Sequence, residues 1–309
     1  MKASVHPLPT GSQETIADLG PSFRRHLEAE NKSGRTVQVY LESLNALERY
    51  LIAEDLPTEV GTIRREHIEA FVADLLTHAK ATTASVRYRS LQQFFKWALS
   101  DDLIVRSPME KMNPPKVIVD VPDVLRLPEL QKLLHVCEGS GYRERRDMAL
   151  LMFLMDTGCR LDEVTRLQVS DVDLDNGTAT VLGKGRRKRH VGLGRKLVRS
   201  LDRYIRLRAQ HPQADSTALW LGSKGPMTNS GIAQLVEARG IQAKLSRRLH
   251  PHLFRHSWAH MMKVLDSPDE DTMTLAGWQS PQMLARYGKS AASERALETH
   301  RRLSPADRL

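Results

Sequence analysis

Four side chains suited to chemistry on a phosphate lie within residues 249–287: His252, Arg255, Trp278 and Tyr287. His252 and Arg255 are three residues apart, so both side chains would project from one face of a helix. Trp278 carries a ring N–H donor, and Tyr287 follows nine residues later with a phenol. A cation, an imidazole, an indole and a phenol in one segment indicate a site that acts on a phosphate group.

A further arginine and a glutamate lie upstream of this segment. Arg160 and Glu163 are three residues apart, and they follow a stretch that is apolar all round, which predicts a fully buried helix over residues 145–157. Gly158 ends that helix. Because Arg160 leaves a buried element directly, we expect its guanidinium to be held stiffly.

A lysine lies at the tip of a predicted β-hairpin. Residues 178–182 and 189–192 have the pattern of two paired strands, and Lys184 lies between two glycines in the turn that joins them. A basic turn of this kind is often only solvated. Its place between the two groups of polar residues makes Lys184 a candidate member of the same site.

These residue types are the ones that metal-free cleavage of a phosphodiester requires: a nucleophile, donors for the non-bridging oxygens and a proton for the leaving oxygen. Tyr287 would be the nucleophile and would form a phosphotyrosine. The pKa of an ordinary tyrosine is about 10, so its proton needs an acceptor, for which His252 is the candidate base. Arg160 and Arg255 offer planar forked donors to the two non-bridging oxygens.

The remaining candidates assist this chemistry. Lys184 would protonate the departing 5′ oxygen, and Trp278 would donate its indole N–H to a phosphate oxygen. Glu163 would orient Arg160 or its neighbours and not react itself. The pattern gives no task to His256 and His260, which we interpret as structural. Trp278 or Tyr287, each taken alone, would more often be a packing residue.

The charge of the chain is distributed unevenly. The formal net charge is +9; residues 1–120 hold 15 Lys and Arg against 16 Asp and Glu, and the remaining residues hold 31 against 21. The basic excess therefore lies in the part that carries the candidate site, and it favours a polyanionic partner. The alternative is a basic surface that serves solubility alone.

The length of 309 residues favours two domains. Residues 1–12 are predicted to be a disordered leader, and residues 13–112 a bundle of about four helices, with helical apolar spacing over 14–29, 37–51, 65–78 and 83–100. The last of these helices has a polar face that could meet phosphates and base edges. This face consists of Arg87, Arg89, Gln92, Gln93 and Lys96. The alternative for the bundle is a generic interaction module with a solvated charged face.

Prolines punctuate the chain after the bundle, which predicts an extended linker over 113–124. Residues 125–309 then form the second domain, which is mainly helical and has one small antiparallel sheet. Helices are predicted over 128–137, 145–157, 195–210, 229–242, 252–265, 281–285 and 293–301, the last in the tail. An acidic turn over 267–271 precedes residues 272–276.

Several classes of protein are disfavoured by composition. Cys137 and Cys159 are the only cysteines and lack metal-ligand spacing, so reduced thiols in a cytosol are expected, with no metal and no cofactor. No signal peptide pattern and no apolar run of membrane-spanning length is present. We therefore expect a cytoplasmic protein without a membrane partner.

Together the motifs resemble those of the tyrosine recombinase (phage integrase) family, and the resemblance covers nearly the whole chain. The family patterns are Gly-x-Arg-x-x-Glu, Gly-Lys-Gly, His-x-x-Arg and a Gly-His/Trp pair nine residues before the nucleophile. They are matched in that order by Gly158, Arg160 and Glu163, by Gly183, Lys184 and Gly185, by His252 and Arg255, and by Gly277, Trp278 and Tyr287. Each motif alone is weak, but their order and placement make the set specific.

The resemblance implies a fold and an activity. The fold would be an N-terminal helical core-binding (SAM-like) bundle followed by the mixed α/β catalytic domain of DNA breaking-rejoining enzymes. The activity would be site-specific strand exchange through a 3′-phosphotyrosine and a Holliday junction, without metal or ATP. Four protomers would assemble on two core sites in double-stranded DNA, with the tail over 293–301 docking on a neighbour. Arg186 and Arg187, beside the lysine, are further candidates for contacts to DNA.

Two departures from family patterns bear on the biological role. The Gly-Trp pair replaces the Gly-His of housekeeping dimer resolvases, which favours an enzyme of a phage or another mobile element. No arm-binding domain is expected before the bundle, so the chain would be a simple two-domain, Xer-like recombinase. The alternatives are a Xer-like dimer resolvase, a type IB topoisomerase-like enzyme and a non-catalytic DNA-binding regulator.

Overall fold

The computed structural model describes residues 13–118, 122–183 and 187–309, and in the last helix the side chains of all residues except 286, 288–290, 293 and 298. The chain divides into two compact units, Met1–Val119 and Asp120–Leu309. This division falls within the segment predicted as the linker. The predicted leader, residues 1–12, lies outside the described residues, as do Lys184 and Arg186. In the described part, no helix is long and apolar enough to cross a membrane.

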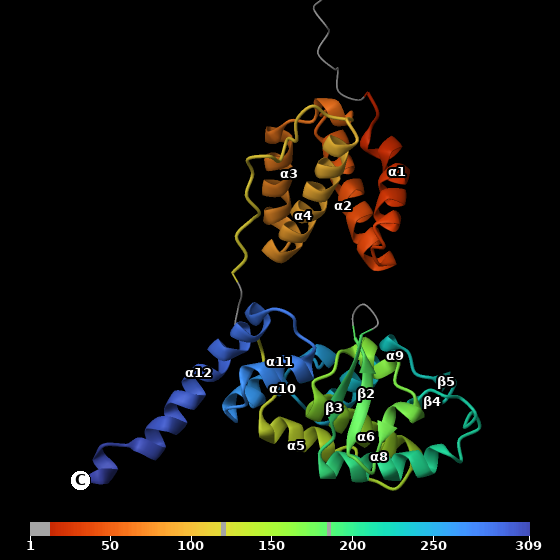
Figure 1. Cartoon of the computed structure of the whole chain (residues 1–309), viewed down its shortest axis with the longest axis vertical. Helices are drawn as coiled ribbons and strands as arrows, with labels where there is room; N and C mark the ends of the chain where they lie inside the picture. Colours follow the sequence, from red (N-terminus) through yellow and green to blue (C-terminus); the bar gives the residue numbers. More distant parts are fainter. Residues whose placement is uncertain (1–12, 119–121, 184–186) are drawn as a thin grey trace, which may run out of the picture. The chain divides into compact units, whose positions relative to one another are not determined.

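Unit 1 is a four-helix bundle, which confirms the prediction of a helical N-terminal region. Its helices are α1 (Ile16–Ala29), α2 (Gly34–Ala53), α3 (Arg65–His78) and α4 (Ala81–Ser100), with a single 3₁₀ turn at Val60–Thr62 (Figure 1). Thr15 and Asp18 form a capping box at the start of α1, and Ser33 caps α2, so both helices begin where side chains satisfy free backbone N–H groups. The rings of Phe23, Phe94 and Trp97 pack in edge-to-face and tilted contacts in the core of the bundle.

Unit 2 is mainly helical, as the sequence predicts, and it contains two small antiparallel sheets where one was expected. Its first elements are α5 (Leu127–His135), α6 (Tyr142–Thr157), α7 (Leu161–Thr165), a 3₁₀ turn at Val169–Asp171, β1 (Val172–Asp173), β2 (Thr178–Leu182), β3 (Lys188–Gly192) and α8 (Arg195–Arg208). The chain continues through β4 (Leu221–Gly222), β5 (Gly225–Pro226), α9 (Asn229–Gln242), α10 (Pro251–Val264), α11 (Asp269–Ala276), α12 (Pro281–Leu303) and a 3₁₀ turn at Ala306–Arg308.

The three-stranded sheet has the order β1-β2-β3, and the predicted hairpin is its larger part. Thr180 pairs with His190, which sets Ala179, Val181 and Val191 on the buried face of the sheet. Strands β4 and β5 form the second, two-stranded sheet.

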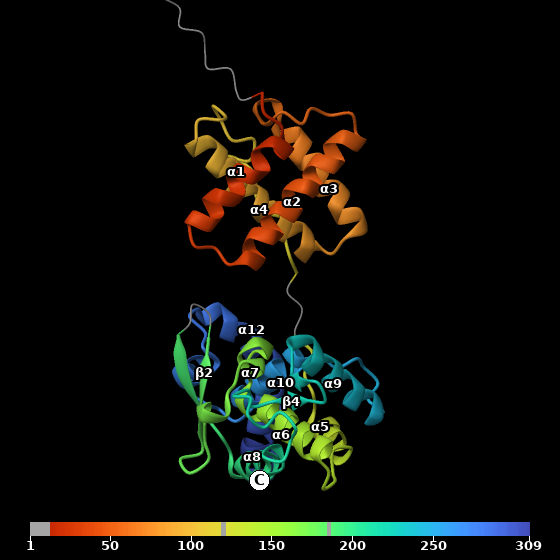
Figure 2. The same cartoon turned by 90° about the vertical axis from the view of Figure 1, so that its right-hand side faces the viewer.

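The core of unit 2 surrounds α6. Its stretch over residues 148–155 is apolar all round, and Leu150, Leu151 and Leu154 there are fully buried. It packs against α8 and α10. In Figure 2, α6 and α10 lie between the three-stranded sheet and the pair α5 and α9.

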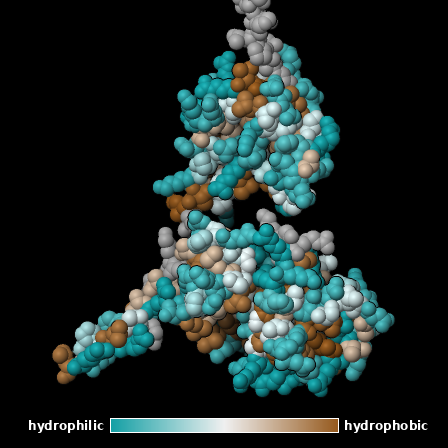
Figure 3. Space-filling model, in the orientation of Figure 1, coloured by the Kyte–Doolittle hydropathy of each residue, from teal (hydrophilic) through white to brown (hydrophobic). Residues whose placement is uncertain are grey.

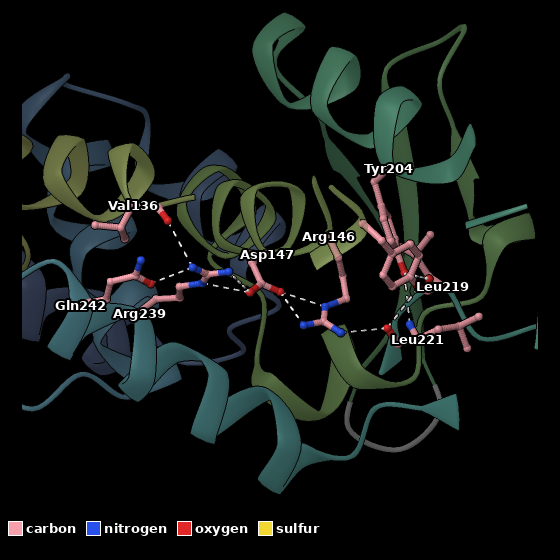
Figure 4. A network of polar contacts seen from close by, with 9 residues as sticks. Val136, Arg146, Asp147, Tyr204, Leu219, Leu221, Arg239 and Gln242 are labelled. Atoms are coloured by element: carbon pink, nitrogen blue, oxygen red, sulfur yellow. Dashed lines mark hydrogen bonds and ion pairs between the residues drawn. The ribbon is translucent and has the colours of Figure 1, made fainter. Parts of the chain in front are cut away.

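A buried polar network ties three helices of this unit together. Asp147 of α6 accepts hydrogen bonds from Arg239 of α9 (2.7 and 2.9 Å) and from Arg146 (2.8 Å), as Figure 4 shows. Arg146 also donates to the carbonyl of Leu221, and Tyr204 of α8 donates to that of Leu219. The two arginines direct their donors to Asp147 and to backbone carbonyls within unit 2, so we assign the network a structural role.

Two predicted boundaries near the C-terminus are wrong. The acidic residues expected in a turn over 267–271 begin α11, because Asp269, Glu270 and Asp271 in the first turn interact favourably with the helix dipole. The separate helices expected over 281–285 and 293–301 are one helix, α12. Glycine and serine residues between them lower helix propensity, but Leu284, Tyr287 and Ala291 form a buried stripe that carries the helix through.

The far end of α12 extends away from the rest of unit 2 (Figure 1). Leu297 and Leu303 are exposed there, and Figure 3 shows hydrophobic patches at the end of this extension.

Candidate active site

Arg255 is held by the ends of two helices. It lies on α10, which begins at Pro251, and its side chain is 5% exposed. Its Nη1 donates to the carbonyl of Gly158 (2.7 Å) and its Nη2 to the carbonyl of Ala276 (2.8 Å). Both carbonyls belong to helix C-termini, where acceptors lack a partner within the helix. Arg255 is thereby fixed without a carboxylate and keeps its positive charge for a ligand.

The two helix ends require glycine. Gly158 follows α6 with a φ of 56°, and Gly277 follows α11 with a φ of 64°, both in the left-handed region. A Cβ at Gly158 would also meet the ring of Trp258 at 2.5 Å. Gly158 and Gly277 thus place the carbonyls that hold Arg255.

Arg160 is positioned by Glu163, as the sequence suggested for that carboxylate. Its Nη1 donates to Oε1 of Glu163 (3.0 Å), and its backbone N–H donates to Oε2 (2.8 Å), so Glu163 satisfies the backbone N–H at the start of α7. Glu163 is buried, whereas Arg160 is about one-third exposed. Arg160 is therefore anchored through its backbone N–H and one terminal nitrogen, and the rest of its guanidinium is accessible to a ligand.

A further arginine, which the sequence analysis did not single out, shares this carboxylate. Both terminal nitrogens of Arg189 on β3 donate to Glu163 (2.8 Å each), and its Nε donates to the carbonyl of Leu275 (2.8 Å). Arg189 thus ties β3 and α7 to the end of α11. The signal available in the sequence is its place two residues before Val191, on the inward side of the strand.

The site has an excess of positive charge. Burial alone would raise the pKa of Glu163, but hydrogen bonds from Arg189 and from the backbone of Arg160, together with their charges, hold it below its usual range. Burial, followed by the charge of Arg160, lowers the pKa of Arg255 to about 10. Arg160 and Arg189 share the carboxylate of Glu163, and Arg255 adds a third guanidinium that no carboxylate binds, which favours binding of an anion.

Trp278 and Tyr287 form a stacked pair beside Arg255. Their ring centroids are 5.2 Å apart with an interplanar angle of 8°, and the guanidinium carbon of Arg255 lies 5.0 Å from the centre of the Trp278 ring. Both aromatic side chains are buried, at 6% and 3% exposure. The rings therefore lie in direct contact with the arginine that the helix ends hold.

The indole N–H of Trp278 is buried without a hydrogen-bond partner among the described residues. The hydroxyl of Tyr88 and the indole N–H of Trp220 are in the same condition, but each lies within the core of its own unit. Trp278 differs because it adjoins the cationic cluster. A buried donor without a partner costs free energy, so this position suits an acceptor such as a phosphate oxygen.

Two of the three histidines of α10, His252 and His256, bear on the roles that the sequence analysis assigned. His252 lies on the exposed side of α10, and its pKa is lowered, first because its ring is partly desolvated and then because His250 and Arg255 add positive charge nearby. His256, one turn later, places Nδ1 at 2.6 Å from the hydroxyl oxygen of Tyr287. The histidine interpreted as structural is therefore the one that contacts the phenol.

A cavity of 610 Å³ opens beside these residues. Arg160, Arg189 and Trp278 line it, together with Arg187 and Lys188 from the hairpin and Met273 and Met283 from the helices α11 and α12. Arg187, a predicted DNA contact, thus faces the same space as the candidate catalytic arginine. No group of three or more His, Cys, Asp or Glu that could hold a metal ion is found among the described residues.

The predicted residues fall into three groups. Arg160, Glu163, Arg255, Trp278 and Tyr287 lie together, with His252 on the adjoining turn of α10. Lys184 and Arg186 lie outside the described residues. The predicted DNA-binding face belongs to unit 1: Arg89, Gln92, Gln93 and Lys96 are exposed on α4. Arg87 differs because it lines a 440 Å³ hollow together with Glu42 and Glu48.

Comparison with known proteins identifies the class to which this fold and site belong. Residues 123–294 match the phage integrase family, and residues 19–104 match the phage integrase N-terminal SAM-like domain. The chain belongs to the phage integrase family, whose members are the tyrosine recombinases.

Its relatives and structural neighbours are recombinases. The chain is 26% identical over 291 residues to tyrosine recombinase XerC of Pediococcus pentosaceus, covering 92% of this chain and 96% of the relative. It is 31% identical over 213 residues to tyrosine recombinase XerD of Bifidobacterium longum, and the match covers 65% of this chain and 69% of the relative. The fold is similar to that of XerH bound to a palindromic difH substrate, with a TM-score of 0.74, 19% identity and coverage of 93% and 84%. The fold is also similar to that of a lambda integrase dimer bound to a COC′ core site, with a TM-score of 0.72 and 17% identity. This match covers 89% of this chain and 95% of the lambda integrase chain.

Proposed function

We propose that this chain is a site-specific DNA recombinase that cuts and rejoins DNA strands through a 3′-phosphotyrosine at Tyr287 and a Holliday junction. The observation that carries the proposal is the place of the Tyr287 hydroxyl. It lies within a cluster that combines an imidazole at 2.6 Å, a stacked indole with a free N–H and a buried arginine. A phosphotyrosine formed there would keep the energy of the phosphodiester for the rejoining step.

The arginines stabilise charge in this mechanism. As Tyr287 attacks, negative charge develops on the non-bridging oxygens of the scissile phosphate. Arg160 and Arg255 donate to these oxygens, Arg160 from its exposed end and Arg255 through N–H groups that Gly158 and Ala276 do not use. Trp278 adds its indole N–H. Lys184 protonates the departing 5′ oxygen, and Glu163 with Arg189 positions Arg160.

The proposed partner is double-stranded DNA with two core sites, bound by four copies of the chain. Support comes from structural neighbours, which include a lambda integrase tetramer bound to a Holliday junction. The exposed apolar residues Leu297 and Leu303 on the extended end of α12 suit the docking on a neighbouring copy that the assembly requires. The enzyme would act in the cytoplasm, where its DNA lies.

We further propose that the chain serves a mobile element, because Trp278 stands where housekeeping resolvases have histidine. The relatives named XerC and XerD favour resolution of DNA dimers instead. The position of the DNA cleavage site in the genome distinguishes the two roles. Cleavage mapped beside the chain's own gene supports the mobile element, and cleavage at one chromosomal site far from it supports dimer resolution.

Covalent trapping tests the activity. A binding site is first selected by the protein from a random duplex library. It is then offered as a duplex nicked next to the scissile phosphate, so that the short 5′-hydroxyl fragment diffuses away and rejoining fails. The protein is expected to form a DNA adduct that survives denaturing electrophoresis, and Tyr287→Phe is expected to form none. An adduct with Tyr287→Phe, or binding of the selected site without any cleavage by the natural protein, contradicts the proposal.

A further inference from the structure

The proposed nucleophile contacts a residue to which the sequence analysis gave no task in the chemistry. His256 lies on α10, and Tyr287 lies on α12, 31 residues later. Nδ1 of His256 and Oη of Tyr287 are 2.6 Å apart, at the short end of hydrogen-bond distances. The two rings also lie against each other, with centroids 5.5 Å apart and an interplanar angle of 37°. The hydroxyl is therefore held by a group that can take its proton.

The neighbouring histidine is placed differently. His252 precedes His256 by one helical turn, and the two rings stack at 6.4 Å with an angle of 28°. The groups that act on His252 are His250, Arg255 and Arg160, so its ring lies on the cationic side of α10. His252 is thus positioned beside the arginines, whereas His256 is positioned toward the phenol.

We propose that His256 is the general base that accepts the proton of Tyr287 during cleavage. The inference rests on the proposed recombinase activity and assigns the proton step within it. With its own proton on Nε2, His256 accepts the phenol proton at Nδ1. The Oη–P bond forms, the P–O5′ bond breaks, and O5′ takes a proton from the leaving-group acid, for which Lys184 is the candidate. In rejoining, the imidazolium returns its proton to Oη.

The test separates proton transfer from hydrogen bonding. In His256→Asn the side-chain amide occupies the place of Nδ1, so a hydrogen bond to Tyr287 persists but no group can accept a proton at neutral pH. In His256→Gly the ring is removed, and added imidazole can occupy its space. His135→Asn is the matched control, because His135 is exposed on α5. The probe is the nicked selected duplex, made once with an ordinary phosphate and once with sulfur in place of the bridging 5′ oxygen.

We expect His256→Asn to bind the duplex within about threefold of the natural protein and to form the covalent adduct about 100- to 1000-fold more slowly. Imidazole should restore adduct formation in His256→Gly, in proportion to its concentration, and His135→Asn should be unchanged. A 5′ thiolate leaves without a proton, so the sulfur substrate should rescue a variant of the leaving-group acid, Lys184→Ala, but not His256→Asn.

Three results overturn the inference. They are adduct formation by His256→Asn at the natural rate, full rescue of His256→Asn by the sulfur substrate, and failure of imidazole to act on His256→Gly. The second would make His256 the acid for the leaving group. Failure of the recombinase proposal looks different, because the natural protein itself would then form no adduct on either substrate.

Discussion

At the scale of single residues, the site depends on how its charges are fixed. Arg255 is bound by two carbonyls and retains its full positive charge, whereas Arg160 shares the charge of Glu163 with Arg189. The first arrangement suits a group that meets a phosphate in the transition state. The second suits a group whose direction must be set before the substrate arrives.

Arg255→Lys tests the arginine at the helix ends. A lysine keeps the charge but cannot contact both carbonyls of Gly158 and Ala276 and still present a fork to the phosphate. We expect adduct formation to slow by about 100-fold or more, with DNA affinity changed only a few-fold. Arg199→Lys, on the exposed side of α8, is the control and should be unchanged. Cleavage by Arg255→Lys at the natural rate would contradict the role.

Arg189→Met tests the positioning of Glu163. The substitution leaves a buried carboxylate with one arginine in place of two, and loss of one partner of a buried ion pair costs about 3–5 kcal/mol. We expect a fall of that order in the free energy of unfolding in urea, and slower adduct formation because Arg160 is less well fixed. Glu163→Gln in the same background should recover part of the stability, because no buried charge is then left with a single partner.

The carboxylate also makes stability depend on pH. The pKa of Glu163 is lowered in the folded protein, so its contribution is fully present above the pKa of an unfolded glutamate, about 4.3, and is lost as pH falls through the lower folded value. We expect the gap in melting temperature between the natural protein and Glu163→Gln to be largest near pH 7 and to shrink below pH 4. A gap that is constant between pH 7 and pH 3 would exclude this linkage.

At the scale of elements, helix ends build the site. The C-terminus of α6 offers its carbonyl at Gly158 and leads directly to Arg160, and the C-terminus of α11 offers Ala276 and leads to Trp278. A third element, α12, brings Tyr287 against α10. Its position is supported by Glu294, two turns later, which accepts from Arg126 and contacts His260 at 3.0 Å.

Gly158→Ala tests the end of α6. The alanine would have to adopt a positive φ, and its Cβ would meet the Trp258 ring at 2.5 Å. Both the backbone conformation and the packing therefore disfavour the substitution. We expect a loss of about 2–4 kcal/mol in the free energy of unfolding, measured in urea. Gly192→Ala, in β3 of the same unit, has open space around its Cβ and is the control, with an expected change below about 1 kcal/mol. Equal effects of the two substitutions would refute this assignment.

At the scale of the whole molecule, we propose that the two units divide the work of holding DNA and cutting it. Unit 2 carries the basic excess and the site, and unit 1 offers the exposed face of α4. If Arg89 and Lys96 on this face contact phosphates, each releases counterions on binding. Affinity for the selected site should then fall steeply as salt rises.

The salt dependence gives the test for unit 1. We expect Arg89→Ala and Lys96→Ala each to lower the slope of log affinity against log salt by about 1, with little effect on the rate of cleavage once DNA is bound. Lys32→Ala, in the turn between α1 and α2, is the matched control. Unchanged slopes for both test variants would show that this face of α4 does not contact DNA phosphates.

The sequence by itself determined the class of fold, the family and the set of reactive residue types. Helical apolar spacing, the apolar stretch that became α6 and the hairpin of β2 and β3 are local patterns. The spacing of Arg160 and Glu163, and of His252 and Arg255, is likewise set within one helical turn.

Only the tertiary structure decided which of these groups meet. The contact of His256 with Tyr287 spans 31 residues, and that of Arg189 with Glu163 spans 26. The carbonyls that hold Arg255 come from α6 and α11, and α12 continues through its glycine and serines because its buried stripe packs on α10. These features depend on the packing of elements distant in sequence, and packing free energy overrides local propensity there.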